Sequence, residues 1–269
     1  MKPRDRSLSR SLGVLQYVLP LLTLAGGIVI WEAVVQIRNI PAYVLPAPSL
    51  VFTTLINDWP VLLDSLLTTL LTTLEGFIAA AVGGIAMALL FSRSKWLEYS
   101  FFPYAVILQV TPVIAIAPLL LIYLPQHVAV VVCAWIVAFF PVLSNTTLGL
   151  NSVDRNLVGL FDLYGASRAQ TLRYLKLPSA LPHILGGLRI AGGLSLIGAV
   201  VAEIAAGSAG AGSGLAYRIA ESGYRLNIPR MFAALLLLSA AGIVIYMALS
   251  LMSYLVLRRW HESALGKDN

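Results

Sequence analysis

The sequence is poor in charged residues, in cysteine and in histidine. Charged side chains make up 11% of the 269 residues, and the single cysteine, Cys133, excludes a disulfide within the chain and a cysteine-based metal cluster. The three histidines, His127, His183 and His261, lack the spacing of metal ligands. The glycine-rich segment 207–214 is not followed by the Lys-Ser or Lys-Thr pair of a phosphate-binding loop. We therefore expect no metal site and no nucleotide site in this chain.

Apolar residues fill most of the chain. They make up 59% of it, and the mean hydropathy is +0.86, whereas soluble domains contain about 45–50% apolar residues. Several apolar runs reach the roughly 20 residues that cross about 30 Å of hydrocarbon, and a helix in lipid satisfies its own backbone hydrogen bonds. The sequence therefore predicts an all-α polytopic membrane protein with about six transmembrane helices. We place these spans at 13–36, 63–92, 101–123, 127–146, 184–206 and 231–257.

Two local features refine this arrangement. Pro41, Pro46 and Pro48 exclude a continuous helix after the first span, and Ser49 is typical of the N-cap of a short interfacial helix that runs to Asp58. The fifth span is rich in glycine, which allows transmembrane helices to pack closely, so we expect it at the centre of the bundle. Its glycines are Gly186, Gly187, Gly192, Gly193 and Gly198.

Lysine and arginine are distributed unevenly between the two sides of the predicted bundle. With the N-terminus inside, thirteen fall on the inner side and four on the outer side, while Arg189 lies within a span. Because cytoplasmic loops are enriched in lysine and arginine, we expect both termini in the cytoplasm. The same bias explains the net charge of +6 without nucleic acid as a partner. The four outer arginines are Arg38, Arg218, Arg225 and Arg230.

The basic N-terminal segment precedes an apolar run that continues to Val35 without a small-residue cleavage site. We therefore interpret this run as a retained first span and not as a signal peptide. The chain divides into a basic cytoplasmic N-terminus at 1–12, a single transmembrane domain at 13–258 and a cytoplasmic tail at 259–269. Within the transmembrane domain we expect a cytoplasmic loop at about 147–182.

A polar, basic segment at 145–183 interrupts the apolar sequence. Ser152 is typical of a helix N-cap, Gly165 of a left-handed helix end, and Ser167-Arg168-Ala169-Gln170 of a capping box that begins a second helix. Pro178 is expected to end that second helix. The segment therefore predicts two short helices joined by a tight turn, which would form a rigid docking element. The alternative is an ordinary loop lying on the lipid headgroups.

Three polar residues within the predicted spans are candidates for a solute pathway. Glu203 lies late in the fifth span, Glu75 in the second and Gln109 in the third. A charged side chain at the centre of a bilayer costs at least about 2.5–3.5 kcal/mol, so such residues are functional candidates. The alternative for Glu203 is a structural ion pair with Arg218 or Arg225, and for the other two it is an interhelical hydrogen bond.

The polar loop resembles a known motif. Gly165, a nine-residue gap and Leu175-x-Leu177-Pro178 are similar to the EAA loop of ABC importer permeases, Glu-Ala-Ala-x3-Gly-x9-Ile-x-Leu-Pro. The segments 44–49 and 201–203 resemble the nitrate, sulfonate and taurine branch of that family, which includes importers of the pyrimidine precursor of thiamine. The chain departs from the motif at 159–161, where Gly-Leu-Phe stands in place of Glu-Ala-Ala. This departure removes the acidic contact with the ATPase that the motif implies.

The resemblance implies the membrane permease subunit of an ATP-driven importer, with no catalytic residue and no cofactor bound by this chain. ATP and Mg²⁺ would be bound by a separate ATPase subunit, two copies of which would dock on a permease homodimer in the inner cell membrane. An extracytoplasmic substrate-binding protein would deliver a nitrate-, sulfonate- or taurine-like anion or a pyrimidine vitamin precursor. The implied ATPase-coupling residues are Gly159, Leu160, Phe161, Gly165, Ala166, Ser167, Arg168, Leu175, Leu177 and Pro178.

Two other classes of function are weighed against this one. A self-contained, ion-coupled secondary transporter would use carboxylates near the middle of the membrane, such as Glu75 and Glu203, at its binding site. An intramembrane enzyme would need paired catalytic groups, and the sequence offers none at a suitable spacing.

Overall fold

The computed structural model describes residues 5–207 and 212–258, and within these ranges all the regular secondary structure is helical. The predicted cytoplasmic tail at 259–269 lies outside the described residues. The first half of the chain forms α1 (Asp5–Ile37), α2 (Pro48–Asn57), α3 (Trp59–Arg93), α4 (Lys95–Val110) and α5 (Val113–Tyr123). The second half forms α6 (Gln126–Asn151), α7 (Arg155–Leu163), α8 (Arg168–Thr171), the π-helix η1 (Leu172–Lys176), α9 (Leu177–Ala206), α10 (Leu215–Tyr224) and α11 (Ile228–Leu257).

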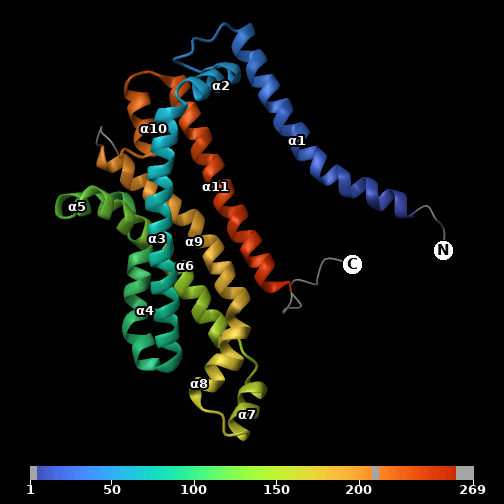
Figure 1. Cartoon of the computed structure of the whole chain (residues 1–269), viewed down its shortest axis with the longest axis vertical. Coiled ribbons are helices and arrows are strands. Elements are labelled where there is room, and N and C mark those ends of the chain that lie inside the picture. Colours follow the sequence, from blue (N-terminus) through green and yellow to red (C-terminus); the bar gives the residue numbers. More distant parts are fainter. Residues whose placement is uncertain (1–4, 208–211, 259–269) are drawn as a thin grey trace.

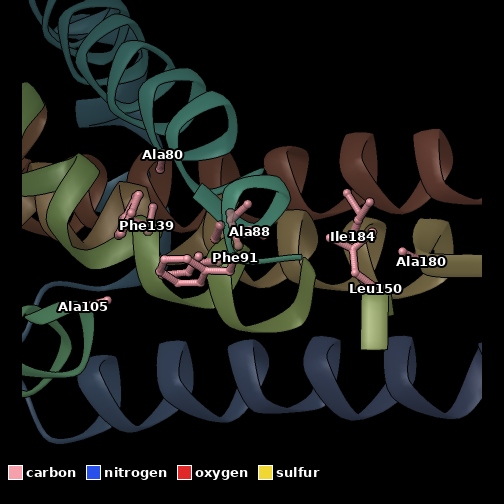
Figure 2. Packing of buried hydrophobic residues seen from close by; sticks show 12 residues of the cluster. Ala80, Ala88, Phe91, Ala105, Phe139, Leu150, Ala180 and Ile184 are labelled. Atoms are coloured by element: carbon pink, nitrogen blue, oxygen red, sulfur yellow. The ribbon is translucent and has the colours of Figure 1, made fainter. Parts of the chain in front are cut away.

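Three long helices, α3, α6 and α9, pack together as the core of the bundle, and α11 lies against α9 (Figure 1). Figure 2 shows part of the buried cluster that these helices share, in which Leu150 of α6 lies beside Ile184 of α9, and Phe91 of α3 and Phe139 of α6 lie further along the bundle. The central position predicted for the glycine-rich fifth span is therefore confirmed.

Glycine is required where α9 crosses α6. A Cβ atom on Gly198 would lie 2.7 Å from the carbonyl oxygen of Cys133 and 2.8 Å from the Cα atom of Ala134. Both are backbone atoms, which cannot rotate away as a side chain can. On the same helix, a Cβ atom added to Gly193 would meet no atom within 4 Å, so that position would accept a side chain. The small residues thus set how closely α6 and α9 approach.

The first helix leaves the bundle. Figure 1 shows α1 extending away from the other long helices, and in the most apolar stretch of its candidate span, Val18–Ile37, only 6% of the residues are buried. It is attached through Glu32, whose carboxylate accepts hydrogen bonds from the Ser49 backbone N–H at 2.9 Å and the Ser49 hydroxyl at 2.7 Å. The prediction of Ser49 as an N-cap was wrong, because α2 begins one residue earlier at Pro48 and the Ser49 side chain is used to hold α1.

The predicted third span, 101–123, is not one straight helix. It is divided into α4 and α5, whose axes differ by 99°. The break falls at Thr111-Pro112, because proline lacks an N–H donor and its ring disfavours a helical conformation at the preceding residue. Thr111 is accordingly extended, with φ −74° and ψ 123°. Five described helices are long and apolar enough to cross a membrane, and a sixth span results if this bent pair counts as one.

Candidate functional site

The polar loop forms a compact knob at one end of the bundle (Figure 1), which we define as residues 154–171. It begins with Asp154, whose carboxylate accepts a hydrogen bond from the Asn156 backbone N–H at 2.8 Å. Asp154 is thus the N-cap of α7, and the prediction of Ser152 for this role was wrong. The Ser152 hydroxyl instead donates to the carbonyl of Gly149 in the last turn of α6, which reaches Asn151.

The turn after α7 depends on Gly165. This glycine has φ +68°, in the left-handed region that residues with a Cβ atom rarely adopt. Its N–H donates to the Asp162 carbonyl at 3.0 Å, and the Ala166 N–H donates to the Phe161 carbonyl at 3.0 Å. These two bonds are the pattern of a Schellman motif with glycine as its left-handed residue. The prediction that Gly165 ends the first loop helix is confirmed.

The capping box predicted for the second loop helix is also confirmed. The Ser167 N–H donates to the Gln170 side chain at 2.7 Å, and the Gln170 N–H donates to the Ser167 hydroxyl at 3.3 Å. Two reciprocal hydrogen bonds therefore fix the direction in which the chain leaves the turn. Together, the glycine turn and the capping box give the knob a defined shape from local sequence alone.

Pro178 does not end this second helix, contrary to the prediction. Helical structure continues from Arg168 through η1 into α9 and reaches Ala206, a length of 39 residues. Pro178 lies in the first turn of α9, and the wide π-helical turn directly before it supplies the change in hydrogen bonding that a proline requires. This continuous helical segment, Arg168–Ala206, is called the rod below, and it joins the knob to the far side of the membrane domain.

The ten residues predicted to couple to an ATPase occupy two environments. Gly159, Leu160, Gly165, Ser167 and Arg168 are exposed on the knob. The remaining five are at least partly buried. Leu175 is buried, while Phe161, Ala166, Leu177 and Pro178 are half-buried.

Two exposed residues of the knob were not predicted from the sequence. Leu163 and Tyr164, at the end of α7, have 86% and 84% of their surfaces accessible. Large apolar side chains this exposed outside a lipid-facing span are typical of a protein contact surface. Their position beside Gly165 is the signal that could have identified them.

A second group of polar residues lies at the opposite end of α9. Glu203 is buried, and its Oε2 accepts hydrogen bonds from the Thr69 hydroxyl at 3.0 Å and the Ala216 N–H at 3.1 Å. The Leu215 N–H donates to the Thr69 hydroxyl at 2.8 Å. Glu203 thus holds together α3, α9 and the start of α10. A Cβ atom on Gly214 would overlap the Glu203 carboxylate, so the close approach of α10 requires glycine there.

The alternative of an ion pair between Glu203 and Arg218 or Arg225 was wrong. Both arginines pair with Glu221, at 3.0 Å each, and Arg218 also donates to the Ser65 hydroxyl. Burial of Glu203 behind α10 separates its carboxylate from these cations.

Glu203 lines a polar pocket of about 310 Å³ together with Thr68, Thr72, Gln126 and His127. His127 also lies 2.8 Å from the carboxylate of Glu75, so the structure brings two of the three pathway candidates to the same region. The third, Gln109, is exposed on α4 and does not line this pocket.

The chain is similar in sequence and in fold to known membrane transport proteins. The family described as "binding-protein-dependent transport system inner membrane component" matches residues 80–263. The chain is 33% identical to the riboflavin transport system permease protein of Chloroflexus aurantiacus, covering 98% of this chain and 97% of that one. It is also 33% identical to the formylaminopyrimidine transport permease protein of Halalkalibacterium halodurans, covering 85% and 90%. A solved structure of the MetNI methionine ABC transporter, in an inward-facing conformation, has the same fold, with a TM-score of 0.64, 18% identity and coverage of 74% of this chain and 98% of that one.

Proposed function

Since the chain belongs to the family of binding-protein-dependent transport system inner membrane components and is the permease subunit of an ABC importer, we propose that its knob is the site where the ATPase subunit docks. The ATPase and a substrate-binding protein are the partners that this family implies. ATP binding and hydrolysis would take place on the separate ATPase subunit. Transport would therefore be driven by ATP and not by an ion gradient acting on this chain alone.

The observation that carries this proposal is the continuous helix from the knob to Glu203. Movement of an ATPase bound to the knob would act on α8, and α8 continues through η1 into α9. Because α9 packs against α3, α6 and α11, a tilt of this rod would change the packing of the whole core. Alternating access would follow if the ATP-bound ATPase favours one tilt of the rod over the other.

We propose that two copies of the chain form the pathway, with both knobs and both termini in the cytoplasm. The excess of lysine and arginine on the knob side supports this orientation. Two identical permeases would present two knobs, one for each ATPase. In this arrangement the Glu203 pocket of each copy would lie toward the extracytoplasmic side, where the binding protein delivers the solute.

The Tyr164→Asp variant is expected to lose its ATPase. A carboxylate in place of an exposed ring would be buried without a partner on docking, which costs several kcal/mol. The measurement is the amount of ATPase subunit that co-purifies with the chain from mild detergent. We expect at least a 10-fold decrease, which corresponds to about 1.4 kcal/mol.

Tyr224→Asp is the matched control for this pull-down. Tyr224 is 90% exposed, compared with 84% for Tyr164, but it ends α10 at the opposite end of the molecule (Figure 1). This variant should retain its ATPase. Equal retention by both variants would show that α7 does not form the docking surface.

We propose further that the solute is an uncharged nitrogen heterocycle rich in N–H donors. The pocket beside Glu203 supports this class, since its described lining contains a carboxylate and no lysine or arginine. The hydroxyls of Thr68 and Thr72 donate to backbone carbonyls of their own helix, which leaves their oxygens free to accept hydrogen bonds. An anion such as nitrate would meet like charge there. The riboflavin and formylaminopyrimidine permeases to which this chain is similar are named for solutes that are nitrogen heterocycles.

Mass spectrometry of small molecules released from the co-purified binding protein tests the proposed solute class. We expect a nitrogen heterocycle with several N–H groups. Recovery of nitrate, bicarbonate or a sulfonate would contradict the assignment while leaving the docking role of the knob untouched. Addition of the recovered compound should then stimulate ATP hydrolysis by the reconstituted complex.

A further inference from the structure

A second cavity lies between the knob and the end of α3. It has a volume of about 530 Å³ and is bounded by the last turn of α3, by α7 and by the helical turns of α8 and η1. Four of its lining residues are charged, namely Arg93, Asp162, Arg168 and Lys176. ATPase docking on the exposed face of the knob leaves this cavity without a role.

The cavity carries more positive than negative charge. Arg93, Arg168 and Lys176 make no ion pair or side-chain hydrogen bond with any residue that the structure describes, and Asp162 is the one carboxylate in the described lining. A neighbouring cation outside the cavity is neutralised, because Lys95 contacts the Glu98 carboxylate at 2.6 Å. Three unpaired cations around one space repel each other, and an anion in that space would stabilise the arrangement.

The residues around the cavity indicate that it lies at the boundary between the membrane and water. Arg93 is the last residue of α3, whose apolar sequence is long enough to cross the membrane. It is followed by Lys95 and by Trp96, which is 84% exposed, and tryptophan is enriched at the level of the lipid headgroups. Figure 1 shows α8 close to the turn between α3 and α4, in agreement with the shared lining.

We propose that this cavity binds a phosphate group, supplied by the headgroup of an anionic phospholipid or by a soluble phosphate compound. Two guanidinium groups and one ammonium group suit such a ligand, because arginine binds phosphate oxygens through paired N–H donors and lysine supplies a point charge. Basic pockets between transmembrane helices at the cytoplasmic side commonly hold anionic headgroups. The assignment rests on the proposed cytoplasmic position of the knob.

A phosphate group in this position would connect the membrane domain to the knob. Arg93 belongs to α3, whereas Arg168 and Lys176 belong to the rod that continues into α9. A ligand that contacts all three would restrain the knob relative to α3. The permease would thereby respond to the composition of the inner leaflet or to a soluble phosphate compound.

Native mass spectrometry of the full chain, purified in mild detergent and supplied with phosphatidylglycerol or phosphatidylcholine, tests this site. The test variant replaces Arg93, Arg168 and Lys176 by glutamine, and the control variant replaces Lys95, Arg155 and Arg258 by glutamine. Both variants lose three positive charges, but only the first loses them from the cavity. Because basic residues near the membrane surface attract anionic headgroups, we expect at least a 10-fold loss of phosphatidylglycerol retention in the cavity variant alone.

Competition with inorganic pyrophosphate distinguishes the two sources of phosphate. Displacement of phosphatidylglycerol by pyrophosphate, or a pyrophosphate-dependent thermal stabilisation that only the cavity variant lacks, would assign a soluble ligand to the same site. Retention of phosphatidylglycerol against pyrophosphate would assign the lipid. Equal lipid retention by the wild type and both variants, or an equal loss in both variants, with no effect of pyrophosphate, would overturn the proposal. Because binding is measured on the chain alone, failure here is separable from failure of the ATPase pull-down.

Discussion

Gly165→Pro is expected to reduce solute uptake at least about 10-fold in a chain that still inserts into the membrane. Proline fixes φ near −65°, whereas Gly165 has φ +68°, so the turn between α7 and α8 cannot form. Proline also removes the N–H that donates to the Asp162 carbonyl. The knob would lose its shape, and ATP hydrolysis would no longer be coupled to movement of α9. The measurement is uptake together with ATP hydrolysis in reconstituted complexes.

A graded series of substitutions at this position separates backbone conformation from other effects. Asparagine tolerates the left-handed region better than alanine, for which the cost is about 1–2 kcal/mol. Uptake should therefore fall in the order Gly, Asn, Ala, Pro at position 165. Gly186→Ala is the control, because Gly186 lies in α9 outside the knob and nothing lies within 4 Å of an added Cβ. Normal uptake by Gly165→Pro at normal expression would show that this turn has no part in coupling.

Glu203→Leu is expected to destabilise the outer end of the bundle and to abolish uptake. The Ala216 N–H would lose its buried acceptor, and an unsatisfied donor costs about 1–3 kcal/mol, whereas the Thr69 hydroxyl would keep the Ser65 carbonyl as an acceptor. Gly214→Ala should have a similar effect, because its Cβ would displace the same carboxylate. The unfolding temperature of the detergent-solubilised chain measures the first effect, and uptake measures the second.

Glu203→Gln separates the hydrogen bonds of this residue from its charge. The amide oxygen of glutamine can accept from both donors, so we expect the unfolding temperature to stay close to that of the wild type. Uptake should still fall at least about 10-fold if the negative charge contributes to the solute pathway. Normal uptake by this variant would leave Glu203 with a structural role only. Gly193→Ala, on the same helix in open space, should change neither measurement.

The knob was the part of the site that the sequence predicted best. Its turn and its capping box depend on contacts between residues three to five positions apart, which a sequence displays directly. Errors arose where a residue had a distant partner available. Ser49 was predicted as a cap, but its hydroxyl binds Glu32, 17 positions earlier. Pro178 was predicted to end a helix, but the π-helical turn before it lets the rod continue.

The membrane class, the number and approximate limits of the long helices, and the resemblance to ABC importer permeases were all evident from the amino-acid order, and the family match confirms the last of these. They follow from the length of apolar runs and from local backbone chemistry. Which polar residues meet is a property of the folded molecule. Thr69 and Glu203 are 134 positions apart, and Arg93 and Lys176 border one cavity although they belong to different helices. Such pairings depend on how α3 and α9 pack, and helical periodicity within either segment does not specify that packing.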